Sequence, residues 1–250
     1  MTSESLQNKT ILVTGAAKRV GAAIARRLHR SGAKLALHYH ASEREAHALQ
    51  SELNLQRPQS VILVKADLLE IAGLAEIVKT CVEQFGALDA LVNNASAFYP
   101  TPIGTIAERS WDELVGTNLK APLFLAQAAA PQLKKSAGCI VNITDIHAER
   151  PLKNYVVYSV AKAGLVGLTR SLARELGPEV RVNGVAPGPI LWPEDGAFDE
   201  LTRQRVISHT LLKRSGEPDD IARAVHYLIA EAPYVTGQII AVDGGRSVNM

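Results

Sequence analysis

Short apolar runs rich in β-branched residues alternate along the chain with longer segments whose apolar positions recur every three or four residues. The short runs are typical of buried strands, and the longer segments are typical of amphipathic helices. Strands are predicted at 10–14, 34–39, 60–64, 90–94, 138–144, 181–186 and 238–242. Helices are predicted at 20–31, 42–56, 68–85, 111–133, from before 158 to 176, and at 221–229. This alternation predicts an α/β fold with a doubly wound parallel sheet of the Rossmann type and helices on both faces.

No composition break, repeat or linker interrupts the pattern, so residues 1–250 are expected to form a single domain. Residues 189–212 differ from the rest because their periodicity is weak and they contain Trp192, Pro193 and several acids. A mobile segment of this kind often covers a crevice, and we predict that it covers the substrate. The helix at 111–133 is expected to bend because a proline lies inside its pattern.

The turn between the first strand and the first helix has a glycine at each end, Gly15 and Gly21. Glycines let the backbone approach a phosphate closely, and the start of the helix presents free N–H groups to it. The spacing Thr-Gly-x-x-x-Arg-x-Gly meets the usual dinucleotide-binding fingerprint only in part. On its own, the turn fits a nucleotide site and a plain tight turn equally well.

The end of the second strand lacks the carboxylate that NAD-binding proteins place near the ribose 2′-hydroxyl. The strand ends at Tyr39, and the first acid after it is Glu43, at the start of the next helix. Lys18 and Arg19 face this strand end from the first turn. The site is therefore cationic and suited to a 2′-phosphate, which predicts NADPH as the cofactor.

Polar and aromatic residues follow two further strands. Asp67 comes after the third strand, where ligand contacts gather in open α/β sheets, although it could equally cap the next helix. Asn93 and Asn94 end the fourth strand and can satisfy backbone groups there, for structure or for function. Phe98 and Tyr99 follow in a proline-marked loop, as a packing pair or as a platform for a ligand.

Tyr158 and Lys162 lie four residues apart in a predicted helix, so their side chains share one face. A nearby ammonium favours the phenolate, and the pKa of Tyr158 is predicted to fall from about 10 toward neutrality. Such a phenol serves as a general acid or base. A Tyr-x-x-x-Lys pair by itself is usually a solvated surface pair. Asp145, directly after the fifth strand, and the glycine turn together favour the catalytic interpretation.

The composition of the chain argues against several classes of binding partner. The net charge of +2 is too small to favour nucleic acid or an anionic membrane. No apolar run reaches the roughly 18 residues that a membrane span needs. Cys81 and Cys139 are too few for a disulfide framework or a cysteine zinc site, which fits a reducing cytoplasm. His38 and His40 share a strand face, but no third ligand is apparent, so no metal site is predicted.

With these pieces placed, the chain resembles the short-chain dehydrogenase/reductase family over essentially its whole length. The matching residues are Thr14-Gly15 with Gly21, Asn93-Asn94-Ala95, Asn118, Tyr158 with Lys162, Arg181-Val182-Asn183, Pro187-Gly188 and Val242-Asp243-Gly244-Gly245. The resemblance implies a nicotinamide-dependent oxidoreductase in which Tyr158 donates the proton. It also implies that Lys162 binds the nicotinamide ribose and that Asn118 holds a proton-relay water. Family members are commonly tetramers, so a homotetramer is expected.

Two departures from the family pattern point to a subgroup. Asp145 stands where most members have a catalytic serine, and Arg19 stands where most have the middle glycine of the first turn. Together with residues 94–100, these departures resemble pteridine reductases and the related dihydromonapterin reductases. That resemblance implies that Phe98 stacks the pterin against the nicotinamide. An ionised Asp145 cannot supply the neutral hydroxyl donor that a carbonyl oxygen would require.

A further departure concerns the cofactor phosphate. The protozoan pteridine reductases carry Tyr-His-Arg-Ser after the second strand, and this chain has Ala41 in place of the arginine. Binding of the 2′-phosphate is then expected to depend on Arg19, His40, Ser42 and the backbone.

The leading prediction is an NADPH-dependent pteridine reductase acting on dihydropterin, and by extension on oxidised pterin. Two alternatives stay open: a carbonyl or 3-oxoacyl thioester reductase of the same family, and a non-catalytic NADP-sensing protein. The predicted catalytic residues are Asn118, Asp145, Tyr158 and Lys162. The predicted cofactor-binding residues are Gly15, Lys18, Arg19, Val20, Gly21, His40, Ala41, Ser42, Asp67, Leu68, Asn94, Ala95, Ser96, Thr144, Tyr158, Lys162, Pro187, Gly188 and Ile190. The predicted substrate-binding residues are Arg19, Ser96, Phe98, Asp145, Tyr158, Leu191 and Trp192.

Overall fold

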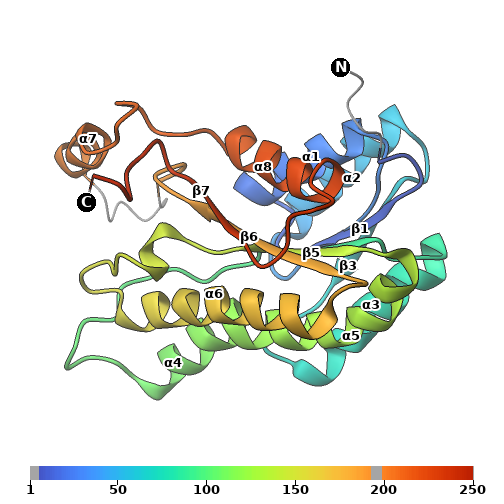
Figure 1. Cartoon of the computed structure of the whole chain (residues 1–250), viewed down its shortest axis with the longest axis horizontal. Coiled ribbons are helices and arrows are strands. Elements are labelled where there is room, and N and C mark those ends of the chain that lie inside the picture. The colour runs from blue at the N-terminus through green and yellow to red at the C-terminus, as the bar shows by residue number, and fades with distance from the viewer. Residues whose placement is uncertain (1–5, 193–198, 250) are drawn as a thin grey trace.

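The computed structural model describes residues 6–192 and 199–249. Its centre is a parallel sheet of seven strands in the order β3-β2-β1-β4-β5-β6-β7 (Figure 1). The strands are β1 (Thr10–Val13), β2 (Lys34–Tyr39), β3 (Val61–Lys65), β4 (Ala90–Asn93), β5 (Cys139–Ile143), β6 (Arg181–Pro187) and β7 (Ile239–Val242). Each strand runs parallel to its neighbours. The predicted doubly wound parallel sheet is confirmed.

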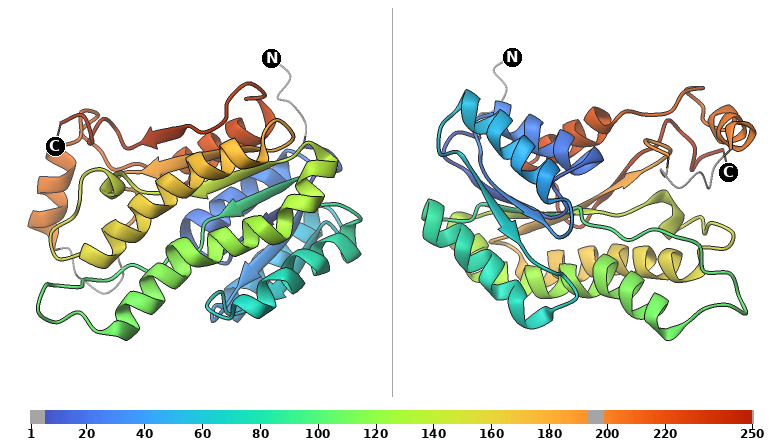
Figure 2. Two further views of the ribbon diagram at one scale, coloured as in Figure 1. Left: turned by 60° about the horizontal axis from the view of Figure 1, so that its bottom comes forward. Right: turned by 180° about the vertical axis from the view of Figure 1, so that it is seen from behind.

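Helices cover both faces of the sheet (Figures 1 and 2). One face carries α1 (Arg19–Arg30), α2 (Glu43–Gln56) and α8 (Pro218–Ala230). The other carries α3 (Leu74–Phe85), α4 (Glu108–Val115), α5 (Ala121–Ser136) and α6 (Val156–Leu176). The remaining helix, α7 (Glu200–Ser208), lies at one end of the molecule, beside the C-terminus in both figures.

The sheet divides the apolar core in two because successive residues of a strand point to opposite faces. Ile11 and Val13 of β1 pack with the side of α1, α2 and α8, whereas Leu12 packs with the side of α3 and α5. All three side chains are completely buried. Burial on both faces explains why the strands read as uninterrupted apolar runs in the sequence.

The helix predicted at 111–133 is divided into three parts. A π-helical turn, Gly116–Lys120, separates α4 from α5. Pro122, the second residue of α5, lacks the N–H that would bond to the carbonyl four residues earlier, so the irregularity has a local cause. The bend that the proline predicted therefore takes the form of a widened turn, and Asn118 lies within it.

Two other segments differ from the sequence prediction. The helix predicted from residue 68 begins as a 3₁₀ turn, Ile71–Gly73, and becomes α-helical only at Leu74. The segment 189–212 contains a regular helix, α7, although its periodicity is weak. No residue of α7 is buried, so no apolar stripe was needed to dock it. Residues 193–198 of this segment lie outside the described part of the chain.

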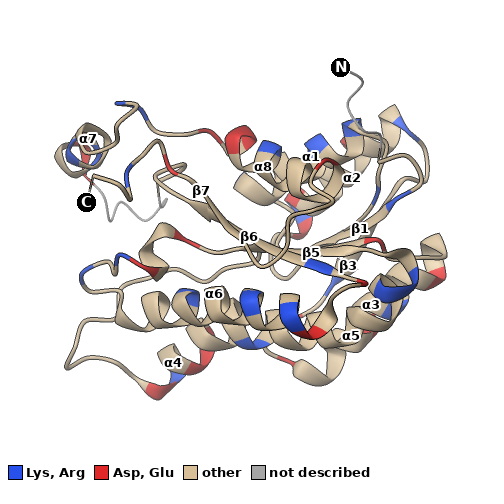
Figure 3. Ribbon diagram, viewed as in Figure 1, with Lys and Arg blue, Asp and Glu red and all other residues tan. Residues whose placement is uncertain are grey.

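The order of the strands locates the functional crevice. The chain builds β1, β2 and β3 outward in one direction and then returns to place β4 on the other side of β1. Ligands of open α/β sheets bind at this point of reversal, beyond the carboxyl ends of the strands. Within the described ranges, no helix is long and apolar enough to cross a membrane. Figure 3 shows both signs of charge along the outer helices.

Candidate active site

A cavity of about 730 Å³ opens beyond the carboxyl ends of the strands. Almost every residue predicted to bind cofactor or substrate lines this cavity. Those that line it are Gly15, Lys18, Arg19, Val20, Gly21, His40, Asp67, Leu68, Asn94, Ala95, Ser96, Phe98, Thr144, Asp145, Tyr158, Lys162, Pro187, Gly188, Ile190, Leu191 and Trp192. Ala41, Ser42 and Asn118 are the predicted residues that do not line it.

The glycine turn between β1 and α1 is held by backbone contacts that exclude larger residues. Gly15 has a φ of +59°, and a Cβ there would lie 2.8 Å from the Cα of Ala95. A Cβ on Gly21 would overlap the carbonyl oxygen of Gly15 and lie 2.7 Å from Asn94 Nδ2. That same Nδ2 donates to the carbonyls of Thr14 and Gly15, at 2.9 Å each. Asn94 therefore braces the turn while it lines the cavity.

The start of α1 faces the cavity and has no side-chain cap. Its first N–H groups and the positive end of the helix dipole are therefore available to a phosphate. Lys18 lies 3.3 Å from a carboxylate oxygen of Glu45, an ion pair at the rim. The Arg19 guanidinium instead donates to the carbonyls of Leu191 and Trp192, at 3.1 to 3.2 Å. The Arg19 side chain thus connects the glycine turn to the beginning of segment 189–212.

The backbone of Arg19 has a conformation that glycine adopts more readily than arginine. Its φ is +54°, in the left-handed region that glycine enters without steric cost. An arginine held there accepts local backbone strain, so its side chain is expected to contribute something that glycine cannot.

The two histidines of β2 have different surroundings. Nδ1 of His38 accepts from the Gly15 N–H, and its Nε2–H donates to the carbonyl of Ala66, both at 3.2 Å. Burial lowers the pKa of His38 to about 4, so the ring is a neutral brace for the turn. Nε2 of His40 lies 3.8 Å from a carboxylate oxygen of Asp67, at the open end of the cavity. Among the described residues, no group of three His, Cys, Asp or Glu side chains could hold a metal ion.

Two residues near the predicted phosphate site differ from expectation, and a third, Asp67, meets it. Ala41 is exposed and Ser42 only precedes α2, so neither is brought into the cavity. The reason is local, because the chain turns away from the crevice into α2 directly after His40. Asp67 does both things left open by the sequence: it lines the cavity, and its carboxylate accepts from the Leu69 N–H at 2.9 Å.

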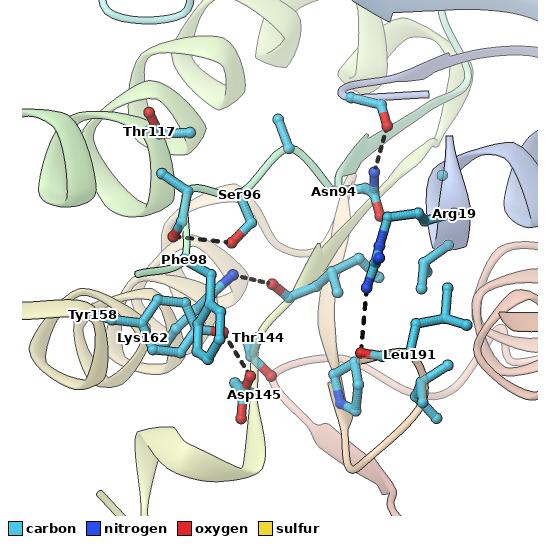
Figure 4. A pocket seen from close by; sticks show the side chains of 18 of the residues that line it. Arg19, Asn94, Ser96, Phe98, Thr117, Thr144, Asp145, Tyr158, Lys162 and Leu191 are labelled. Carbon is cyan, nitrogen blue, oxygen red and sulfur yellow. Dashed lines mark hydrogen bonds between the residues drawn. The ribbon is translucent and has the colours of Figure 1, made fainter. Parts of the chain in front are cut away.

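The predicted catalytic side chains Tyr158, Lys162 and Asp145 meet at one wall of the cavity (Figure 4). The Tyr158 hydroxyl donates to Asp145 Oδ2 at 2.6 Å. The other carboxylate oxygen accepts from the backbone N–H of His147 at 2.8 Å. Nζ of Lys162 donates to the carbonyl of Ile143 at 2.9 Å and lies 5.7 Å from the centroid of the Tyr158 ring.

The predicted lowering of the Tyr158 pKa is wrong in this structure. Burial raises the pKa of Tyr158 well above its ordinary value of 10, and the Asp145 carboxylate raises it further. Burial also lowers the pKa of Lys162 to about 8, against a smaller opposing effect of Asp145. The sequence could not show that a carboxylate contacts the hydroxyl directly while the ammonium faces a backbone carbonyl. Tyr158 is consequently protonated, as a proton donor must be.

Asn118 lies behind the cavity wall and is 1% exposed. Its Nδ2 donates to the carbonyls of Ala97 and Leu114, at 2.9 Å each. Its Oδ1 accepts from the Ser96 hydroxyl at 2.7 Å. The side chain therefore fixes the loop after β4 against the π-helical turn and positions Ser96 at the cavity. The predicted relay water on Asn118 stays a prediction.

The two aromatic residues of the loop after β4, Phe98 and Tyr99, contact different parts of the structure. The Phe98 ring stacks on Tyr155, with ring centroids 4.5 Å apart and planes 18° apart. It also meets Tyr158 edge to face, with centroids 4.7 Å apart (Figure 4). The Tyr99 hydroxyl instead donates to the Glu113 carboxylate at 3.2 Å. Phe98 is thus the residue of this pair that reaches the cavity, and Tyr99 packs against α4.

The cavity also contains residues that the sequence analysis did not assign to it. Two of them carry chemistry and had weak signals: His147 lies two residues after Asp145, and Arg246 directly follows Asp243-Gly244-Gly245. Nδ1–H of His147 donates to the carbonyl of Arg150 at 2.8 Å. The additional lining residues are His38, Ala97, Glu113, Thr117, Ile143, Ile146, His147, Leu152, Pro189, Val206 and Arg246.

The chain is similar to a protein family and to known proteins over almost its whole length. The family model described as enoyl-(acyl carrier protein) reductase matches residues 15–247. The chain is 37% identical to pteridine reductase 1 of Leishmania tarentolae, over 95% of this chain and 96% of that protein. It is 36% identical to a 3-oxoacyl-[acyl-carrier-protein] reductase of Staphylococcus epidermidis, over 95% of this chain and 98% of that protein.

A solved structure with the same architecture is that of a blue fluorescent protein from a metagenomic library in complex with NADPH. The TM-score is 0.91 at 35% sequence identity, and the match covers 97% of this chain and 99% of that chain. The family model and both relatives match almost the whole chain. The chain belongs to the short-chain dehydrogenase/reductase family.

Proposed function

We propose that this protein is an NADPH-dependent pteridine reductase that converts a dihydropterin to a tetrahydropterin and also accepts oxidised pterin. The observation that carries the proposal is the Asp145 carboxylate, hydrogen-bonded to the Tyr158 hydroxyl beside the Phe98 ring. A pterin is flat and electron-poor, so it gains from stacking on an aromatic ring. Its ring N–H and amino groups are donors, which a carboxylate accepts. The 37% identity to a pteridine reductase supports the same substrate class.

The turn after β1 fits NADPH. Its pyrophosphate would meet the uncapped start of α1, where glycines leave the backbone accessible. Its 2′-phosphate would lie near Lys18 and Arg19, and Lys162 would hold the nicotinamide ribose. NADPH supplies the hydride when it is bound. The structural relative in complex with NADPH supports this cofactor, which the sequence also predicted.

The residues of this chain supply the proton. Reduction of a C=N bond adds a hydride to the carbon and a proton to the nitrogen. The Tyr158 hydroxyl is protonated because burial and Asp145 both raise its pKa. After the transfer, the Lys162 ammonium, 5.7 Å from the Tyr158 ring centroid, stabilises the phenolate that remains. Asp145 is held in place by the His147 N–H and accepts from the donor edge of the pterin.

A second candidate function is the reduction of a 3-oxoacyl thioester. The 36% identity to a 3-oxoacyl-[acyl-carrier-protein] reductase over nearly the full length favours it. The Asp145 carboxylate opposes it, because negative charge develops on a carbonyl oxygen during reduction and is stabilised by neutral or positive donors. A non-catalytic NADP-sensing protein, a third possibility, has no need of Tyr158, Lys162 and Asp145 together at a cavity.

One assay separates these functions. NADPH oxidation by the purified protein is followed with dihydrobiopterin, dihydromonapterin, dihydrofolate and an acetoacetyl thioester. We expect kcat/KM to be highest for a dihydropterin. A higher value for the thioester would support the second function and contradict the first. Tight NADPH binding with no turnover of any substrate would support the NADP-sensing protein.

The predicted homotetramer is part of the proposal. Four large apolar side chains on the helices α4, α5 and α6 are substantially exposed: Trp111 at 47%, Leu123 at 39%, Val156 at 38% and Val160 at 49%. Exposed apolar residues on neighbouring helices are typical of surfaces that bind another subunit. Light scattering on the purified protein measures the mass directly. A cytoplasmic location stays a prediction.

A further inference from the structure

Arg246 lines the cavity from the C-terminal end of the chain. It belongs to a turn after β7, in which the Asp243 carboxylate accepts from the backbone N–H groups of Gly245 and Ser247, at 2.9 and 2.7 Å. The C-terminal segment lies beside α7 in Figures 1 and 2. β7 forms one edge of the sheet, and β2, whose end would face the 2′-phosphate, lies five strands away. Arg246 therefore belongs to the substrate end of the cavity.

Within residues 6–192 and 199–249, the Arg246 guanidinium donates one hydrogen bond. Its Nη1 donates to the carbonyl of Val206 in α7 at 3.0 Å. Of the described residues, none forms an ion pair with it. The Asp243 carboxylate acts on it electrostatically, but both oxygens of that carboxylate accept from backbone N–H groups. A guanidinium has five donors, and no nitrogen of Arg246 is buried without a partner. Its remaining donors are therefore accessible.

A half-buried cation on a cavity wall has lost part of its hydration, and an anion placed against it compensates for that loss. Guanidinium groups bind carboxylates and phosphates with two parallel hydrogen bonds, which gives geometric selectivity as well as affinity. Phe98, Asp145 and Tyr158 lie together at the reacting end of the cavity. A substrate held there by its ring would have its substituent within the same cavity, which Val206 of α7 and Arg246 also line.

We propose that Arg246 binds an anionic group, a carboxylate or a phosphate, on the substituent of the substrate and so favours anionic substrates over neutral ones. This inference rests on the proposed function for its substrate class: a dihydropterin whose side chain ends in a carboxylate, of which dihydrofolate is an available example. The competing interpretation is that Arg246 only fastens the C-terminal turn to α7 through Val206. That role would affect all substrates alike.

The experiment compares dihydrofolate with dihydrobiopterin, whose side chain is neutral. Dissociation constants are measured calorimetrically on the protein loaded with NADP⁺, which cannot turn the pterin over, and kcat/KM is measured with NADPH. The variants are Arg246→Gln, Arg246→Lys and a control, Arg205→Gln. Arg205 is exposed on α7 and does not line the cavity, so it controls for general attraction of anions.

We expect Arg246→Gln to lower the preference for dihydrofolate over dihydrobiopterin by about tenfold or more, the usual effect of losing a charged hydrogen bond. The loss should appear in KM and in the dissociation constant. Arg246→Lys should retain part of the preference because it keeps the charge but not the paired donors. Arg205→Gln should leave the preference as it is. Equal changes for both substrates in Arg246→Gln, or equal changes in the two glutamine variants, would overturn the proposal.

A phosphate as the natural anion is tested by a second pair, acetoacetyl-coenzyme A and the uncharged N-acetylcysteamine thioester. A selective loss on the coenzyme A compound in Arg246→Gln would assign the phosphate. If the unmodified protein neither binds nor reduces pterins, the proposed function fails, and this thioester pair still tests Arg246 separately. Parallel loss on both thioesters would then overturn the role of Arg246 as well.

Discussion

The Tyr158 hydroxyl donates a 2.6 Å hydrogen bond to Asp145 Oδ2 and thereby joins the start of α6 to the end of β5. Both residues line the same cavity. The contact makes Tyr158 a protonated phenol beside a carboxylate, and it leaves Asp145 as an acceptor on the wall where the Phe98 ring also lies. The proposed proton donor, Tyr158, is thus hydrogen-bonded directly to Asp145, the proposed acceptor for the pterin.

Changing Tyr158→Phe should remove most of the activity while NADPH still binds. The hydroxyl delivers the proton, and general acid catalysis typically supplies about 10²–10⁴-fold in rate. The ring would remain in its edge-to-face contact with Phe98, so the cavity wall should stay in place. The measurements are kcat for the preferred substrate and the dissociation constant of NADPH by fluorescence. Retention of more than half of the activity would show that another group donates the proton.

Changing Lys162→Met should abolish turnover and yet stabilise the protein without cofactor at neutral pH. The Lys162 ammonium is buried, with the Ile143 carbonyl as its acceptor. Burial lowers its pKa to about 8. Because burial disfavours the ammonium, an apolar side chain of similar length removes that cost and should raise the free energy of unfolding. Lys120→Met, at an exposed position, is the control and should change stability little.

The same lysine predicts a pH dependence. Between about pH 8 and pH 10.5, Lys162 has lost its proton in the folded protein but keeps it in the unfolded chain. The unfolded state then binds more protons, so the contribution of Lys162 to the free energy of unfolding rises with pH across this window. Subtracting the denaturation curves of Lys162→Met from those of the unmodified protein isolates this contribution. A difference that is flat from pH 7 to pH 10 would contradict the lowered pKa.

The sequence predicted the sheet because burial on both faces leaves a direct record, an uninterrupted apolar strand. The glycine turn was predictable for a similar reason, since Gly15 and Gly21 stand where a Cβ would collide with backbone or with Asn94. Both features restrict which residue types fit at a position, either through burial or through close packing. They can therefore be predicted from residue type.

Features that depend on where a side chain points were not predictable in the same way. Tyr158 and Lys162 lie in one helix as expected. However, the Lys162 ammonium donates to the Ile143 carbonyl, and the Tyr158 hydroxyl donates to Asp145. This reverses the direction of the predicted pKa shift. Arg246 was missed because its place in the cavity follows from the path of the chain after β7, and its position directly after Asp243-Gly244-Gly245 is only a weak signal of that path.

Replacing Arg19 should weaken NADPH binding selectively. Arg19→Ala and Arg19→Gly both remove a cation near the expected 2′-phosphate, and the glycine variant also relieves the left-handed backbone at φ +54°. Loss of a charged phosphate contact should raise the dissociation constant of NADPH roughly 10- to 100-fold. NADH should be affected much less. Lys18→Ala should weaken NADPH binding in the same direction but less, because Lys18 also lies near the expected 2′-phosphate and is already paired with Glu45. Equal use of NADPH and NADH by the unmodified protein would contradict the prediction.

Changing Asp145→Ser tests the substrate class. A serine introduces a neutral hydroxyl at this position, which cannot accept from several pterin donors as a carboxylate does. Loss of a charged hydrogen-bond partner costs a few kcal/mol, so kcat/KM for a dihydropterin should fall by about 100-fold or more. A ketone or a 3-oxoacyl thioester should be reduced as well as before or better, because the neutral hydroxyl suits a carbonyl oxygen.

The companion variant Phe98→Ala separates stacking from hydrogen bonding. It removes a ring that contacts both Tyr155 and Tyr158 at the cavity. The KM of a dihydropterin should rise because a flat ring loses its stacking partner, whereas a small ketone should be affected less. Tyr99→Ala is the control, since Tyr99 packs against α4 outside the cavity lining. Parallel losses on pterin and ketone in both Asp145→Ser and Phe98→Ala would leave the family assignment standing and remove the grounds for a pteridine reductase.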